Sequence, residues 1–179
     1  MRIQRIRQIA IERANCSDVL DWRSATAADR TLLRDFCCTE PANPVFNEET
    51  EDFEHDLPWE LEVQDHVQRL HTPLTFPNYL LLGFLDSELA AVLEVIVTPL
   101  DNYCFVAILA VSQELSGRGY AGEALAQVEG VMRSCGISNE YTVEALVDRD
   151  NFSAKSVFEK GGYHSPDNRN GYERWLAHF

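Results

Sequence analysis

The segment 109–125 constrains the fold more than any other part of the sequence. An apolar, strand-like run ends at Val111, and the glycine-rich stretch SGRGYAGEAL (116–125) then begins a helix-favouring run of alanine and leucine. A helix that starts soon after a strand presents its unpaired amides and the positive end of its dipole at the turn between the two elements. The segment therefore predicts either an anion site, most naturally for a diphosphate, or a tight turn before a packed helix.

The glycines of this stretch, Gly117, Gly119 and Gly122, also have the spacing G-x-G-x-x-G of a dinucleotide-binding loop. Glu144 lies at about the distance expected of a residue that binds ribose hydroxyls. However, the five residues 112–116 make an unusually long connection, and Glu144 lies inside an apolar run rather than at its end. Too little sequence follows for a doubly wound sheet, so a nicotinamide or flavin cofactor is disfavoured.

The order of apolar runs predicts an α/β (α+β) fold, a mixed sheet of six to seven strands with about four helices on its two faces. Turn residues at 86–88 and 99–102 predict an antiparallel meander, after which helices and strands alternate. We expect strands at 19–23, 79–85, 89–98, 103–111, 141–147, around Tyr163 and at 172–176, and helices from Thr26, from Pro58, at 121–135 and at 152–160.

Two segments are less defined. Residues 1–17 fit a helix or an edge strand equally well, and we expect them to form an N-terminal extension to a single domain covering 18–179. This extension is also a candidate for contacts in a homodimer. Residues 39–57, which contain Pro41 and Pro44, predict a long loop that is either functional or mobile.

The formal charge of −14 favours cationic or neutral partners and argues against nucleic acid, whose phosphates need clustered lysine and arginine. No apolar run is long enough to span a bilayer and no signal peptide is apparent, so we expect a cytoplasmic protein without a membrane partner. The five cysteines show no disulfide framework or CxxC pair, and the histidines show no HxxxH or HExxH pair. We therefore expect reduced thiols and no metal.

The residues around the glycine stretch resemble the acetyl-CoA signature of the GNAT N-acetyltransferase superfamily. Leu109-Ala110-Val111 followed by Ser116-Gly117-Arg118-Gly119-Tyr120-Ala121 is similar to Q/R-x-x-G-x-G/A after a strand that ends in an apolar-Ala-Val pattern. A second block, Asn151-Phe152-Ser153-Ala154 with Phe158-Glu159-Lys160-Gly161-Gly162-Tyr163, is similar to N-x-x-A-x-x-x-Y-x-x-x-G-F/Y. The blocks have the family's usual separation, with a strand between them. The resemblance implies a GNAT fold and acetyl-CoA as the acyl donor.

By this resemblance, acetyl-CoA lies in a splay between the strand that ends at Val111 and the strand that contains Glu144. Amides of the glycine stretch would hold the diphosphate, and backbone at 109–111 would pair with the pantetheine arm. The Val111 amide would polarise the thioester carbonyl, and Asn151 would hydrogen-bond the cofactor near the pantetheine. The implied cofactor-binding residues are Leu109, Val111, Ser116, Gly117, Arg118, Gly119, Tyr120, Ala121, Gly122, Asn151 and Phe158.

Two residues depart from the family pattern. Ser116 stands at the Q/R position, which removes a side chain that braces the loop but keeps the amides. Phe158 stands where a tyrosine often protonates the leaving thiolate, so the resemblance supplies no acid. Tyr120, Tyr141, Tyr163 or a water molecule are the alternatives.

Acetylation needs a neutral amine, so a base must take a proton from an ammonium group. Glu94 and Glu144 are the candidate catalytic bases, because each lies within an apolar strand, where burial makes a carboxylate a stronger base. The alternative for each is an acid on the solvent-facing side of a strand. Asp101, in the turn before the strand that ends at Val111, is a third candidate.

The segment that frames the acceptor site in this family is strongly acidic here, with Phe46, Phe53 and Trp59 among the acids. The acids are Glu48, Glu49, Glu51, Asp52, Glu54, Asp56, Glu60, Glu62 and Asp65. Such a surface attracts a polyamine, an aminoglycoside, a basic amino acid or a lysine-bearing protein, unless it is simply solvated. We therefore expect direct acetyl transfer to a primary amine of a cationic small molecule or protein. The alternative, suggested by Ser116 and Phe158, is an acyl-CoA-binding regulator or sensor without efficient catalysis.

Overall fold

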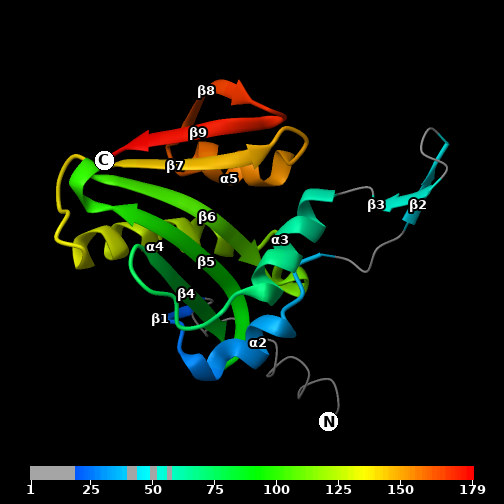
Figure 1. Ribbon diagram of the computed structural model, residues 1–179, viewed down its shortest axis with the longest axis horizontal. Coiled ribbons are helices and arrows are strands. Elements are labelled where there is room, and N and C mark those ends of the chain that lie inside the picture. The colour runs from blue at the N-terminus through cyan, green and yellow to red at the C-terminus, as the bar shows by residue number, and fades with distance from the viewer. Residues whose placement is uncertain (1–18, 40–43, 49–51, 56–57) are drawn as a thin grey trace, which may run out of the picture.

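The computed structural model describes residues 19–39, 44–48, 52–55 and 58–179 (Figure 1). These residues form a seven-stranded sheet, a separate two-stranded hairpin and four α-helices. The sheet contains β1 (Asp21–Ser24), β4 (Asn78–Leu85), β5 (Glu88–Thr98), β6 (Tyr103–Val111), β7 (Thr142–Asp148), β8 (His164–Arg169) and β9 (Tyr172–His178). The helices are α2 (Arg30–Arg34), α3 (Pro58–Arg69), α4 (Tyr120–Ser134) and α5 (Phe152–Lys160). The expected extension, 1–17, lies outside the described residues.

The strands lie in the order β1-β4-β5-β6-β7-β9-β8, and every neighbouring pair is antiparallel except β6 and β7. These two strands run parallel because α4 carries the chain back across the sheet between them, as a parallel connection requires. They pair over only four positions, from Tyr103 with Thr142 to Val106 with Ala145. Beyond Val106, β6 continues to Val111 without β7 as a partner. The predicted mixed sheet is confirmed.

A β-bulge lies in β6 just where the two strands part. Val106 is paired with Val95 of β5 and Ile108 is paired with Glu94, so Ala107 is an extra residue on β6. The bulge reverses the alternation of side chains, and it also increases the local twist of the strand. Val106 consequently packs on one face of the sheet and Ile108 on the other.

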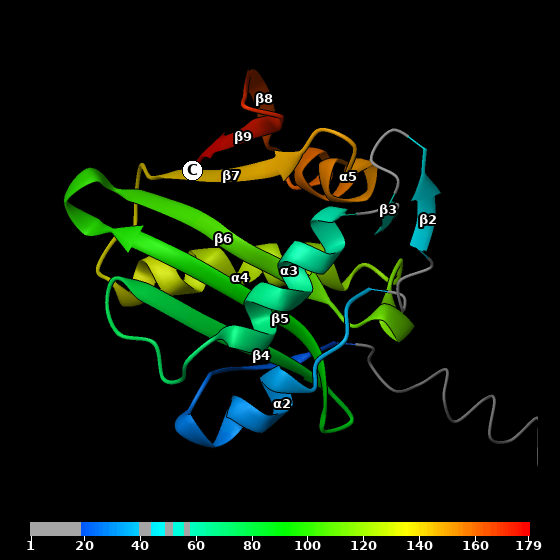
Figure 2. The same cartoon turned by 45° about the vertical axis from the view of Figure 1, so that its right-hand side comes forward.

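The sheet has a hydrophobic core on each face (Figures 1 and 2). Helices α4 and α5 cover one face, where Leu93, Val95, Val106, Leu125, Val128, Val143 and Phe158 share a cluster. Helices α2 and α3 lie on the other face, where Leu33, Val67, Leu82, Val92 and Ile108 pack together. Pro58 begins α3, and its apolar residues at 63, 67 and 70 recur at helical spacing, as the sequence predicts.

The prediction of an uninterrupted loop over residues 39–57 is wrong. Strands β2 (Pro44–Asn47) and β3 (Asp52–His55) form an antiparallel hairpin in which Phe46 stands opposite Phe53 in register. Valine and phenylalanine favour strands, and this preference outweighs the neighbouring prolines and acids. The hairpin lies beyond the N-terminal end of α3 (Figure 1). In the described part of the chain, no helix is long and apolar enough to cross a membrane.

The turn that follows β1 is held by the carboxylate of Asp29, whose side chain is only 4% exposed. Both terminal nitrogens of Arg23 donate to it, at 2.7 and 2.6 Å, and Thr26 donates its backbone N–H and its hydroxyl, at 2.7 and 2.8 Å. The hydrogen bonds from Arg23 are the main cause that lowers the pKa of Asp29 well below its usual range. The ionised carboxylate therefore stabilises the folded state.

We expect Asp29→Asn to lower the free energy of unfolding by about 2 kcal/mol at pH 7, because a buried charge-assisted network is lost. The pKa of Asp29 is lowered on folding, so its contribution is complete above about pH 5 and fades as the pH falls further. The difference between wild type and variant should therefore shrink between pH 5 and pH 2 in urea titrations. Asp35→Asn is the control, since Asp35 and its partner Arg34 are both exposed. An equal loss in both variants would contradict this account.

Candidate active site

The gap between β6 and β7 exposes backbone groups of β6. Ser112 donates its N–H to the Ala90 carbonyl of β5 at 2.7 Å. Because alternate residues of an antiparallel strand face the same neighbour, Ala110 also faces β5, whereas Leu109 and Val111 face the side of β7. The last β6–β7 pair is Val106 with Ala145, so the N–H and C=O groups of Leu109 and Val111 face the gap.

The glycine stretch begins immediately after a short helical turn at Gln113–Leu115. Gly117 has φ of +76° and Gly119 has φ of +92°, a backbone conformation that side-chain-bearing residues rarely adopt. A Cβ atom at either position would meet no atom within 4 Å, so the turn needs glycine for its backbone conformation. The turn surface is consequently open to a ligand.

Several amides of this turn have no internal acceptor. Gly122 donates to the Gly119 carbonyl at 3.0 Å, so the expected contribution of the Gly122 amide is already used within the helix start. The amides of Gly117, Arg118, Gly119 and Ala121 have no hydrogen-bond partner within the described part of the chain. These groups lie at the N-terminus of α4, where the helix dipole also favours an anion. The turn fits a diphosphate.

Other residues of the two sequence motifs have clear structural roles. Asn151 caps α5 by accepting the Ala154 N–H at its Oδ1 atom, at 2.9 Å. Phe158 is buried, and its ring packs edge-on against Tyr163, with the centroids 5.1 Å apart. Ser116 is exposed, as are Gly117 and Arg118. The contacts that these residues make with a cofactor stay predictions.

The three tyrosines considered as acids are all buried. Tyr120 packs in a small cluster with Ala90 and Ala91 of β5. Tyr141 stacks on Phe179, and burial raises the pKa of its hydroxyl. Burial raises the pKa of Tyr163 further. A raised hydroxyl pKa makes a tyrosine a weaker acid, so Tyr141 and Tyr163 are poorly suited to the role.

Glu94 projects from β5 onto the face of the sheet that carries α3, and it bonds a histidine. Its Oε2 atom lies 2.7 Å from Nε2 of His66, a residue of α3. The Glu94 side chain is 8% exposed and the His66 side chain is 47% exposed. Sequence reasoning missed His66, because no local pattern joins residues 28 positions apart. Glu94 is paired with Ile108 of β6, and the next residue of that strand, Leu109, faces the gap. The His66–Glu94 pair therefore lies close to the gap.

Glu144 lies on the same face of the sheet, because its neighbours Val143 and Ala145 both pack on the α4 face. Its Oε2 atom accepts a hydrogen bond from Nη2 of Arg174 on β9, at 3.1 Å. Burial, and then the charge of Glu144, raise the pKa of Tyr103 to about 12. Glu144 is therefore already held in a network with one cation.

Asp101 is exposed in the turn before β6, at the opposite end of that strand from Val111. The rise of a strand separates these ends by roughly 26 Å, which is too far for a direct role at the gap. Among the described residues, no group of three or more histidine, cysteine, aspartate or glutamate side chains is arranged to hold a metal ion.

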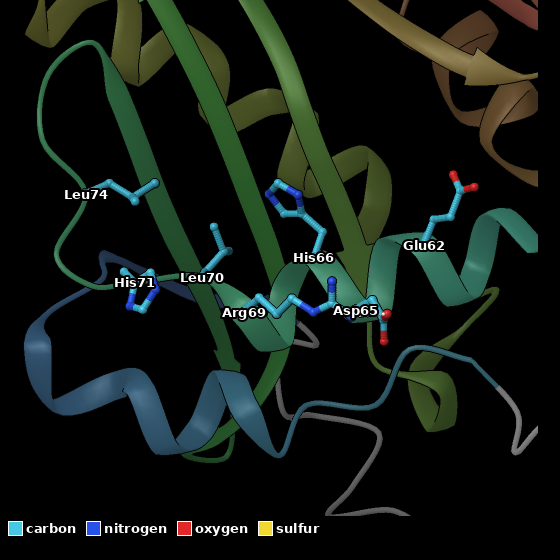
Figure 3. A pocket seen from close by; sticks show the side chains of 7 residues that line it. All are labelled: Glu62, Asp65, His66, Arg69, Leu70, His71 and Leu74. Atoms are coloured by element: carbon cyan, nitrogen blue, oxygen red, sulfur yellow. Dashed lines mark hydrogen bonds and ion pairs between the residues drawn. The ribbon is translucent and has the colours of Figure 1, made fainter.

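An open pocket of about 530 Å³ lies along α3, and His66 forms part of its wall (Figure 3). It is lined by Glu62, Asp65, His66, Arg69, Leu70, His71 and Leu74. Figure 3 shows the imidazole directed from α3 towards the sheet, with Glu62 further along the helix. Asp65 is paired with Arg69 at 2.8 Å, and His71 contacts Arg30 at 3.2 Å.

The family model described as acetyltransferase (GNAT) family matches residues 42–163, more than half of the chain. The chain belongs to this family. The predicted class of enzyme, an acetyl-CoA-dependent GNAT N-acetyltransferase, is thereby confirmed. A search of curated proteins returned no match.

Solved structures share the GNAT fold at low sequence identity. The PaiA N-acetyltransferase of Thermoplasma acidophilum, in complex with coenzyme A, is 18% identical, with a TM-score of 0.62 over 89% of this chain and 99% of that one. The GNAT domain of S. lividans PAT is 18% identical, with a TM-score of 0.63 over 89% and 90%. The spermidine N-acetyltransferase of Vibrio cholerae is 13% identical, with a TM-score of 0.58 over 88% and 92%. The predicted GNAT fold is confirmed.

We expect Gly119→Ala to destabilise the fold by about 1 kcal/mol, because alanine is strained at positive φ, and to weaken acetyl-CoA binding through the displaced turn. Gly130→Ala is the matched control, because Gly130 lies inside α4 with open space around it. Alanine there should stabilise the fold by about 0.5–1 kcal/mol and leave binding unchanged. Urea unfolding and titration calorimetry measure the two effects. Wild-type affinity in Gly119→Ala would contradict the role of this turn.

Proposed function

We propose that this GNAT enzyme transfers an acetyl group from acetyl-CoA directly to a primary amine of a cationic acceptor. The observation that carries the proposal is the proximity of an amide-rich turn, an open strand edge and a His66–Glu94 pair. The turn supplies unpaired amides and the strand edge supplies Leu109 and Val111. Glu94 lies on the neighbouring strand, β5, and His66 lies on α3.

Acetyl-CoA supplies an activated thioester and binds through its diphosphate and amide-bearing arm. In the proposal, the amides of Gly117, Arg118, Gly119 and Ala121 hold the diphosphate. Backbone groups of Leu109 and Val111 pair with the arm as a neighbouring strand would. The Val111 N–H polarises the thioester carbonyl, which stabilises the oxygen as negative charge develops on it.

The acceptor side of the site favours a positively charged amine. Glu62 lies one helical turn before His66, and its side chain is exposed to the pocket. The hydroxyl of Tyr172 donates to it at 3.4 Å, while no cation pairs with it among the described residues. Part of the acidic segment seen in the sequence, including Glu49, Glu51 and Asp56, lies outside the described residues. The exposed carboxylate of Glu62 supports an acceptor with more than one amine.

The second candidate function is an acyl-CoA-binding regulator without efficient catalysis. Ser116 at the usual Q/R position and the buried Phe158 favour it, because each removes a side chain that the family commonly uses. Both candidates require acetyl-CoA binding, and they differ in turnover.

We expect acetyl-CoA at about 100 times its Kd to raise Tm by roughly 5 °C, and NAD to leave it unchanged. We also expect release of CoA thiol with at least one of spermidine, lysine, kanamycin and a lysine peptide. A thiol-reactive dye measures the release, and mass spectrometry identifies the acetylated amine. Binding without thiol release from any of these amines would favour the regulator instead.

We expect Glu62→Gln to raise KM for spermidine roughly threefold and to leave KM for butylamine nearly unchanged, because only the polyamine carries further charges. Glu129→Gln is the control, since Glu129 pairs with Arg133 on the exposed side of α4. Steady-state kinetics at saturating acetyl-CoA measure both constants. Equal changes for the two amines would rule out recognition of a second charge by Glu62.

A further inference from the structure

We propose that His66 is the general base that takes the proton from the acceptor amine, and that Glu94 is the residue that positions its imidazole. The inference rests on the proposed function and deepens it. It assigns the base to a residue of α3, and it changes the role expected of the Glu94 carboxylate from catalytic base to support.

The hydrogen bond between the two side chains fixes which nitrogen is basic. An ionised carboxylate can only accept hydrogen bonds, so the Nε2 atom that lies 2.7 Å from Glu94 carries a hydrogen. In a neutral imidazole the other nitrogen, Nδ1, then bears the free lone pair. A carboxylate behind an imidazole also stabilises the imidazolium that forms when the proton is taken up.

The difference in burial separates the roles of the two residues. The Glu94 side chain is 8% exposed, and one of its oxygens is already engaged by His66. The His66 side chain is 47% exposed and lines the open pocket (Figure 3). Glu94 is not among the residues that line this pocket, so an acceptor in it meets the imidazole rather than the carboxylate. Val67, the next residue of α3, is fully buried against the sheet and anchors the helix there.

No other group competes for the imidazole among the described residues. Asp65 is bonded to Arg69 on the same helix, and His71 contacts Arg30. Glu62 lies one turn away and interacts with Tyr172. Glu144, the other candidate carboxylate, is already bonded to Arg174.

The proposed step balances in atoms and charge. The amine nitrogen forms a bond to the acetyl carbon, and the bond between that carbon and sulfur breaks. An ammonium nitrogen loses two protons in the process. One passes to Nδ1 of His66 and from there to solvent, and the other reaches the thiolate through solvent and gives CoA thiol.

His66→Ala tests the proposal. With the best acceptor among spermidine, lysine, kanamycin and the lysine peptide, we expect kcat to fall about 10²- to 10³-fold. The acetyl-CoA affinity should stay within twofold of wild type. Added imidazole should raise kcat of His66→Ala at least tenfold, because a small base can enter the space left beside Glu94. His164→Ala, at an exposed position of β8, is the control and should keep wild-type kcat.

Glu94→Gln distinguishes positioning from proton transfer. We expect a smaller loss of kcat than in His66→Ala, and no rescue by imidazole, because the native base is still present. His66→Gln preserves the side-chain volume and should be as slow as His66→Ala. A His66→Gln variant with wild-type kcat would overturn the proposal.

Long-range ¹⁵N NMR of the free protein at pH 8 provides a readout independent of turnover. We expect His66 to carry its hydrogen on Nε2, with Nδ1 unprotonated, and Glu94→Gln to populate both tautomers. A hydrogen on Nδ1 in the wild type would overturn the assignment. If the wild type binds acetyl-CoA but acetylates none of the amines, the proposed function fails. If the wild type does acetylate an amine and His66→Ala keeps wild-type kcat, this inference alone is overturned.

Discussion

The separation of β6 from β7 after Val106 and Ala145 is the constraint on which the candidate site depends. Each strand stays paired along its other edge, β6 with β5 and β7 with β9, so neither can close the gap. The bulge at Ala107 adds twist where the strands part. Backbone N–H and C=O groups left open in this way need hydrogen-bond partners. In the proposed function, a ligand with amide groups along an extended arm would supply them, which would connect the topology of the sheet with the choice of acyl donor.

The buried carboxylate of the candidate site lies on β5, the strand next to β6. Glu94 points to the α3 face, whereas its neighbours Leu93 and Val95 pack under α4. A carboxylate buried at this depth is costly unless it is hydrogen-bonded, and α3 supplies the partner through His66. Val67 is buried in the core and fixes α3 against the sheet, so the position of His66 relative to the sheet is fixed as well. In the proposed mechanism, the packing of α3 would thus couple the stability of the fold to the geometry of proton transfer.

Local signals predicted most elements, and contacts distant in sequence account for what was missed. Strand β6 and helix α5 have the predicted bounds, because apolar periodicity ends there at turn residues and glycine. The β2–β3 hairpin was missed because its strand-forming residues are few and stand among prolines and acids. The glycine stretch was recognised from spacing alone, but the internal bond of the Gly122 amide depends on the path of the helix start. The His66–Glu94 and Glu144–Arg174 bonds join residues 28 and 30 positions apart, and only the folded sheet brings them together.

The aromatic residues of the second motif belong to the core. Phe158 and Tyr163 pack against each other, and Phe158 also contacts Trp175, so all three rings serve the core. The raised pKa of Tyr163 makes it a reluctant proton donor. A thiol with an ordinary pKa of about 8.5 is a good leaving group as its thiolate, which lessens the need for an acid near neutral pH. A buried phenylalanine at position 158 is therefore compatible with acetyl transfer. The proton transfer that then most needs a protein side chain is the removal of a proton from the acceptor amine.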